Sequence, residues 1–234
     1  MGNIQNLLIL QLIAHLITDY YLQNDEISKL KRERGFKTGY LYVHALVTFL
    51  TAWLLSCSFN FVVAALAIGF AHLLIDGIKS MLKKWKYVFF ADQLVHIAII
   101  VTVVCFYNQQ VSISLPEWLP ATRYLLVIAG VIICLKPTNV LISNVLETFD
   151  IHSTDTKGET GDLEKAGRLI GNLERILALV FVLLSQFQAI GFLIAAKAIL
   201  RFKDTSTAKT EYVLIGTLLS FGVAILIGVL INHL

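Results

Sequence analysis

The sequence predicts an all-α fold, a bundle of transmembrane helices, and three observations lead to this prediction. Hydrophobic residues make up 57% of the 234 residues, and the mean hydropathy is +0.75. Charged residues make up only 15% and there are 3 prolines, so the chain is too apolar for an ordinary soluble domain. Apolar runs of spanning length recur along it. We therefore expect a polytopic integral membrane protein.

Seven apolar runs are long enough to cross a bilayer. They cover residues 4–23, 39–57, 60–80, 88–107, 121–141, 172–198 and 212–233. The fifth run is the weakest of them, because Pro137 follows only about fifteen apolar residues and could kink or end a helix. We expect seven helices, with six or eight as the alternatives.

The runs divide the chain into two regions. Residues 1–110 hold four helices and almost all of the ionisable residues within apolar sequence, and residues 111–234 hold about three further helices with a polar loop at 150–168. At the start of the sixth run, Glu174 and Arg175 could pair with each other or bind a lipid phosphate.

Loop charges predict the orientation. The first and third loops are basic, whereas the loops near Ser58 and at 108–121 have no lysine or arginine. By the positive-inside rule the basic loops face the cytoplasm and the N-terminus lies outside. Seven spans would then place the basic loop 201–210 outside, against the rule. The net charge of +3 is small and its cations lie between apolar runs, so no nucleic-acid partner is expected.

The chemistry-bearing residues gather at the helix ends predicted to be cytoplasmic. They are His15, Asp19, His44, His72, Asp76, Asp92 and His96. Three pairs among them have the four-residue spacing that places both side chains on one helix face. Because antiparallel neighbours joined by short loops pack together, we expect the seven side chains to share one pocket.

Imidazole and carboxylate are ligands of divalent metals, with zinc the first choice and manganese or iron the alternatives. The three cysteines lack metal-ligand spacing, so we interpret them as small residues of the membrane interior. A bound metal would activate water, with Asp19 or Asp92 as general base. Lys79 could bind an anionic substrate group, although membrane topology alone also explains it. Gln23 and Gln93 could orient ligands.

Three interpretations of the seven residues remain open. The favoured one is a metal-dependent hydrolase acting on an amphiphilic, lipid-like substrate at the inner leaflet. The second is a transporter for a divalent cation or protons, which would need a polar path to the outer face, where the predicted helices are apolar. The third is a membrane scaffold with a structural metal, or polar packing without one.

Three sequence segments and one histidine resemble one bacterial family. HLITDYYLQ, His44, HLLIDGIK and ADQLVH are similar to the membrane family catalogued as domain of unknown function 3307, over about residues 5–105. The resemblance implies an integral membrane protein but no established reaction, and we expect the protein in the bacterial inner membrane. It also implies that ten residues fall on the family's polar positions: His15, Asp19, Gln23, His44, His72, Asp76, Lys79, Asp92, Gln93 and His96. A looser likeness to bacterial inner-membrane metal-dependent hydrolases is an analogy.

Overall fold

The computed structural model describes residues 2–82, 85–111, 115–151, 161–201 and 207–234. All regular structure in these ranges is helical, which confirms the predicted all-α class. The chain divides into two compact units, Met1–Ala129 and Gly130–Leu234. The sequence placed the division at residue 110, and the structure places it within helix α6.

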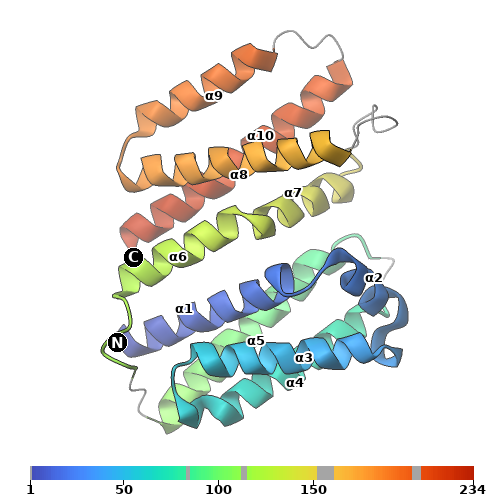
Figure 1. Cartoon of the computed structure of the whole chain (residues 1–234), viewed down its shortest axis with the longest axis vertical. Coiled ribbons are helices and arrows are strands. Elements are labelled where there is room, and N and C mark those ends of the chain that lie inside the picture. Colours follow the sequence, from blue (N-terminus) through green and yellow to red (C-terminus); the bar gives the residue numbers. More distant parts are fainter. Residues whose placement is uncertain (1, 83–84, 112–114, 152–160, 202–206) are drawn as a thin grey trace. The chain divides into compact units, whose positions relative to one another are not determined.

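Four long helices form an antiparallel bundle in the first unit (Figure 1). They are α1 (Gly2–Leu16), α3 (Gly39–Leu55), α4 (Val62–Lys79) and α5 (Val88–Gln110). Helix α1 contacts α3 and α5, and α4 contacts the same two helices, so the four close into a ring. The C-terminal ends of α1 and α4 therefore lie at the same end of the bundle as the N-terminal ends of α3 and α5.

A π-helical turn, η1 (Ile17–Tyr21), continues α1. The amide of Leu22 donates to the carbonyl of Ile17 at 2.9 Å, which closes a wider turn than an α-helix allows. Helix α1 has 15 residues and alone is too short for a span, which needs about 20, but η1 extends it without a break. The wider turn changes the direction in which the residues of this segment point.

A short helix, α2 (Asp25–Arg34), lies at the end of the bundle where η1 ends. The Asn24 side chain caps its start by accepting a hydrogen bond from the Ile27 amide at 2.8 Å. Gly35 ends it with a φ of +52°, and a Cβ there would lie 2.2 Å from Ser80 Oγ at the end of α4. Glycine therefore allows both the turn and the close contact with α4. A 3-10 turn, η2 (Gly35–Lys37), then leads into α3.

The apolar core of the first unit is built around residues of α4 and its neighbours. It contains Leu7, Ala52, Phe61, Ala64, Ala65, Ile68, Ile100 and Val104. At Gly69, α3 comes so close that a Cβ would lie 2.8 Å from Phe49 Cβ and 3.2 Å from the Ala45 carbonyl oxygen. Large apolar side chains such as Phe70 and Leu94 are more than 60% exposed on the outer faces, as a lipid environment would permit.

The second unit contains the end of α6 (Thr122–Cys134) and four further helices. They are α7 (Lys136–Thr148), α8 (Gly161–Leu183), α9 (Phe187–Arg201) and α10 (Thr207–His233). Helix α8 packs against α9 and α10, and α10 also contacts α7. Of the polar loop predicted at 150–168, residues 152–160 lie outside the described residues.

The prediction of one continuous helix over residues 172–198 is wrong. Helix α8 ends at Leu183, and Ser185 adopts a φ of +58°. The amide of Gln186 donates to the carbonyl of Phe181 at 2.7 Å, and that of Ser185 to Val182 at 2.9 Å. These bonds form a Schellman motif, which ends a helix. It was not predicted because a serine and a glutamine are weak stop signals inside apolar sequence.

Several described helices are apolar enough to cross a membrane. By length and composition there are three: Phe59–Lys79, Val88–Gln110 and Leu214–His233. There are five if α2–η2 with α3, and α6 with α7, each count as one bent span. Helices α6 and α7 meet at 47°, beside Pro137, where the sequence predicted a kink. The described residues thus supply three to five candidate spans, and the predicted count of seven is not confirmed.

Glu174 and Arg175, for which the sequence left open a pair with each other or a lipid phosphate, have other partners in the structure. Arg175 is 2% exposed and donates to the Cys134 carbonyl, to Ser220 Oγ and to the side chains of Asn139 and Asn172, at 2.5 to 2.9 Å. The Glu174 carboxylate instead pairs with Lys197. Arg175 therefore joins α6, α7, α8 and α10 through neutral acceptors.

Candidate metal centre

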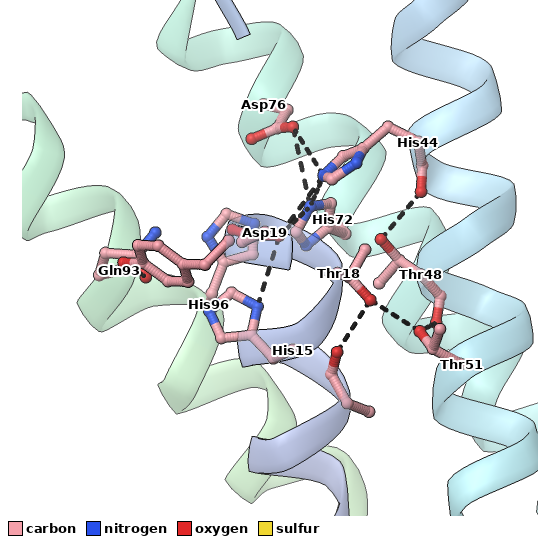
Figure 2. Close-up of polar contacts among 12 residues, drawn as sticks. His15, Thr18, Asp19, His44, Thr48, Thr51, His72, Asp76, Gln93 and His96 are labelled. Atoms are coloured by element: carbon pink, nitrogen blue, oxygen red, sulfur yellow. Dashed lines mark hydrogen bonds and ion pairs between the residues drawn. The ribbon is translucent and has the colours of Figure 1, made fainter. Parts of the chain in front are cut away.

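The structure brings all seven predicted residues into one connected cluster at the α2 end of the first unit. Figure 2 labels all of them except Asp92. Each of the four bundle helices supplies members, because their polar residues lie near the same end of the ring. The exposed fractions are small. They are 2% for His72, 3% for His15 and His96, 5% for Asp92, 6% for His44 and 9% for Asp76, and 14% for the Asp19 side chain. The cluster is therefore an internal site.

Asp19, in η1, lies at the centre of the histidines. Its Oδ1 atom is 3.3 Å from His72 Nε2, 3.4 Å from His44 Nε2 and 3.8 Å from His15 Nδ1. These nitrogens come from α4, α3 and α1, so one carboxylate oxygen faces three helices. The π-helical turn places the carboxylate there, in agreement with the frequent use of such turns at functional sites.

A second group is formed by His44, His72 and Asp76. The Nε2 atoms of the two histidines are 2.9 Å apart, so one donates a hydrogen bond to the other. Asp76 Oδ2 is 3.7 Å from each of these nitrogens and accepts a hydrogen bond from Lys31 Nζ at 2.5 Å. Lys31 extends from α2 and is 7% exposed. The carboxylate is thus held by an ammonium group on one side and faces imidazoles on the other.

A third group is organised around Asp92, on α5. Its Oδ2 atom accepts hydrogen bonds from Lys79 Nζ at 2.6 Å and from Gln93 Nε2 at 3.1 Å. The Tyr20 hydroxyl donates to Gln93 Oε1 at 3.0 Å. Three side chains therefore orient this carboxylate, directly or through one another, as predicted for Gln93 and as is common around metal ligands. Gln23, also expected in this role, lies half-buried just beyond η1.

His96 has a defined tautomer. Its Nδ1 atom lies 2.8 Å from the backbone carbonyl oxygen of Asp92, and a carbonyl only accepts hydrogen bonds. Nδ1 therefore carries the proton, which leaves the Nε2 lone pair available to a metal. The His96 ring contacts His72 and His15, with centroids 4.2 Å and 5.2 Å apart.

Several polar atoms of the cluster are buried without a hydrogen bond. Within the described part of the chain these include both ring nitrogens of His15, His96 Nε2, Asp19 Oδ1 and Asp92 Oδ1. Buried polar groups are nearly always hydrogen-bonded, so several unbonded ones in one place need an explanation. All of them are nitrogen or carboxylate oxygen, the donors that zinc and related ions take. The residues therefore fit a divalent metal.

Three sets of ligand atoms are close enough to surround an ion. They are His15, Asp19 and His72; His44, His72 and Asp76; and Asp76, Asp92 and His96, each with its atoms within 4.8 Å of one another. His72 and Asp76 each belong to two sets. The arrangement could therefore hold one ion with an open position or two neighbouring ions.

One known protein family matches the part of the chain that contains all seven residues of the cluster. A family model described as "Protein of unknown function (DUF3307)" matches residues 7–126, slightly more than half of the chain. The chain belongs to the DUF3307 family. This confirms the resemblance seen in the sequence and extends it past residue 105. No curated protein and no solved structure matches the chain.

The DUF3307 region also contains a small cavity, about 10 Å³, on the apolar side of the cluster. His15, His72 and His96 line it together with Gln11 and Thr48. Its volume is close to that of a single water molecule. Gln11 is 1% exposed, and its side-chain oxygen has no hydrogen bond within the described structure. Polar groups therefore continue about one helical turn beyond the histidines.

Sequence reasoning missed Lys31 as a member of the site. In the sequence it is one of the cations of the first basic loop, which predict only the orientation. A signal existed, because Ile27 and Lys31 lie four residues apart on one face of α2, the face that turns inward. Tyr20 was also missed. Its ring lies in an apolar run, and only the fold shows that its hydroxyl reaches Gln93.

Proposed function

We propose that this protein is an integral-membrane, metal-dependent hydrolase. The observation that supports it most is the cluster of seven ligand-type side chains from four helices, several of whose nitrogen and oxygen atoms are buried without a hydrogen bond in the described residues. Ionisable side chains are energetically costly inside a membrane helix bundle, so a cluster of them indicates a functional site. Zinc is the first candidate because imidazole and carboxylate dominate the set and thiolate is absent from it, with manganese or iron as alternatives.

His72 and Asp76 are the best candidates for the central ligands. Each belongs to two of the three donor sets, so either could hold an ion with His44 or with a residue of a neighbouring set. Three protein ligands would leave a position open for water or substrate. In a structural zinc site, by contrast, protein ligands would fill all four positions.

A bound divalent ion would supply an acidified water and polarise a carbonyl or phosphoryl oxygen. Asp92 is suited to accept the proton, because Lys79 and Gln93 orient its Oδ2 atom and leave Oδ1 unbonded. Asp19 is the other candidate for general base. Hydrolysis adds the hydroxyl of water to the acyl or phosphoryl group and the proton to the leaving oxygen, so no further reactant is needed.

The position of the cluster suggests the substrate and the orientation. It lies at the end of the bundle that carries α2 and Lys79. The basic residues of α2, together with Lys79, would face the cytoplasm. The N-terminus would then lie outside, and the protein would reside in a bacterial inner membrane. An amphiphilic membrane lipid could place its head group at the cluster and its tails among the exposed apolar side chains.

Cation transport is the second candidate function, and the polar groups beyond the cluster favour it. Gln11, Thr48 and Thr51 continue from the histidines toward the middle of the bundle, and the Thr51 hydroxyl is hydrogen-bonded to that of Thr18 at 2.7 Å. Beyond them the apolar core closes the bundle. Uptake of zinc by proteoliposomes, measured with a dye enclosed in the vesicles, would distinguish transport from hydrolysis.

Hydrolysis itself can be tested with the purified protein in lipid micelles. A panel of fluorogenic phospholipids and acyl esters would be offered to zinc-loaded protein, to chelator-treated protein and to the Asp92→Asn variant. We expect product only from the zinc-loaded wild type, and a loss of about 100-fold or more in Asp92→Asn, because general-base catalysis contributes that much. Equal rates with and without metal would contradict the proposal.

A further inference from the structure

Two lysines bind carboxylates of the cluster, and their accessibility differs. Lys31 Nζ lies 2.5 Å from Asp76 Oδ2, and both side chains are 8% exposed. Lys79 Nζ lies 2.6 Å from Asp92 Oδ2, and the lysine side chain is 30% exposed although the aspartate is only 2% exposed. The two carboxylates belong to one donor set whose atoms lie within 4.8 Å. Lys79 can therefore contact a molecule from outside, whereas Lys31 is buried.

The charges of the cluster change sign when a metal binds. Asp19, Asp76 and Asp92 carry three negative charges, and Lys31 and Lys79 carry two positive ones, so the site has a net charge of −1 with neutral imidazoles. One divalent ion makes it +1. A net positive charge in a water-poor site needs an anion, and a phosphate ester, which carries at least one negative charge, supplies one.

We propose that the substrate group recognised at this site is a phosphate ester, with Lys79 binding a phosphate oxygen and Lys31 holding Asp76 in place. This rests on the proposed function, since it requires a bound metal. Lysine is a common phosphate ligand that acts as a compact charge. Lys79 stands at the last turn of α4, beside the candidate base Asp92, so its ammonium group could move from the carboxylate to a phosphate next to the metal.

Lys31 has a different task. Its ammonium group is buried with Asp76, so it is a positioning residue that fixes a candidate metal ligand and does not contact the substrate. Its loss should alter the retention of zinc. The loss of Lys79 should alter phosphate binding while zinc is retained.

The test measures binding of phosphatidic acid to zinc-loaded protein in neutral detergent micelles, with diacylglycerol as the uncharged comparison and inorganic phosphate as the headgroup alone. We expect Lys79→Gln to weaken phosphatidic acid binding at least tenfold with zinc content unchanged, and Lys79→Arg to restore most of it. Lys31→Gln should instead lose zinc more readily in a chelator titration. Lys29→Gln, an exposed lysine of the same helix, is the matched control and should change neither quantity.

The outcomes separate the two proposals. If wild type binds zinc but binds diacylglycerol as tightly as phosphatidic acid, or if Lys79→Gln binds phosphatidic acid normally, the phosphate inference is overturned and the hydrolase proposal stands. Tighter binding of inorganic phosphate than of phosphatidic acid would overturn the lipid source and retain the phosphate site. If wild type binds no metal, both proposals are overturned.

Discussion

Each of the best-defined side chains of the cluster has one polar atom held by the protein and another left unbonded. Asp92 uses Oδ2 for Lys79 and Gln93 and leaves Oδ1 unbonded, and His96 uses Nδ1 for a backbone carbonyl and leaves Nε2 unbonded. This is how metal ligands are usually supported in proteins. All seven side chains could be predicted from the sequence, because ionisable groups stand out against apolar surroundings. Which of their atoms face one another required the fold.

Lys31 gives a prediction at the scale of one ion pair. In metal-free protein, Lys31→Met leaves the Asp76 carboxylate buried without its ammonium partner, and we expect a loss of about 3 kcal/mol in the free energy of unfolding. The double variant Lys31→Met, Asp76→Leu removes both charges and should recover most of this loss. Denaturant titrations in detergent would measure both. Additive losses in the double variant would show that the pair is not coupled.

At the scale of helices, the close approach of α3 and α4 brings His44 and His72 together. Gly69 lies one turn from His72 and touches the backbone of α3, where a side chain would have no space. The sequence allowed the four bundle helices and their antiparallel order to be predicted, because apolar runs and basic loops alternate regularly. It did not allow η1 or the break between α8 and α9 to be predicted, since neither contains a proline or glycine.

Gly69→Ala tests the role of this contact. The added Cβ would lie 2.8 Å from Phe49 Cβ and 3.2 Å from the Ala45 carbonyl, so α3 must move away from α4. We expect a loss of about 1–3 kcal/mol in stability and a weaker retention of zinc. Gly39→Ala, at the start of α3 with no atom within 4 Å of its Cβ, is the control. Unchanged zinc retention in Gly69→Ala would mean that the two histidines do not need this spacing.

At the scale of the whole molecule, the cluster belongs entirely to the first unit, and the second unit has its own polar centre around Arg175. Replacing Arg175 by Leu removes the donor to acceptors on the buried Cys134 and Ser220 and on the half-buried Asn139. We expect a loss of about 2–4 kcal/mol in thermal or denaturant stability. Zinc content per folded chain should remain that of the wild type. Loss of zinc in this variant would show that the metal site depends on the second unit.

Orientation is the other prediction at this scale. Single cysteines would be introduced by Lys29→Cys in α2 and by Glu117→Cys between α5 and α6, both exposed positions, in a chain whose native cysteines are replaced by alanine. Intact cells treated with a membrane-impermeant maleimide should label the cysteine at position 117 and not the one at position 29, because basic loops face the cytoplasm. The reverse pattern would place the cluster at the outer leaflet.

The number of spans could not be fixed from the sequence, because the apolar runs of the second unit contain bends and breaks.

The most direct test of the whole account is the metal content of the purified protein. Wild type and the variants His72→Ala, His96→Ala and His233→Ala would be purified in detergent without chelators, and their zinc, manganese and iron measured by elemental analysis. His233 lies exposed in α10 of the second unit and serves as the control. We expect one or two ions per chain in wild type and in His233→Ala, and a loss of most of the metal in His72→Ala, whose imidazole belongs to two of the three donor sets. A wild type without bound metal, or a His72→Ala variant that retains all of it, would contradict the account.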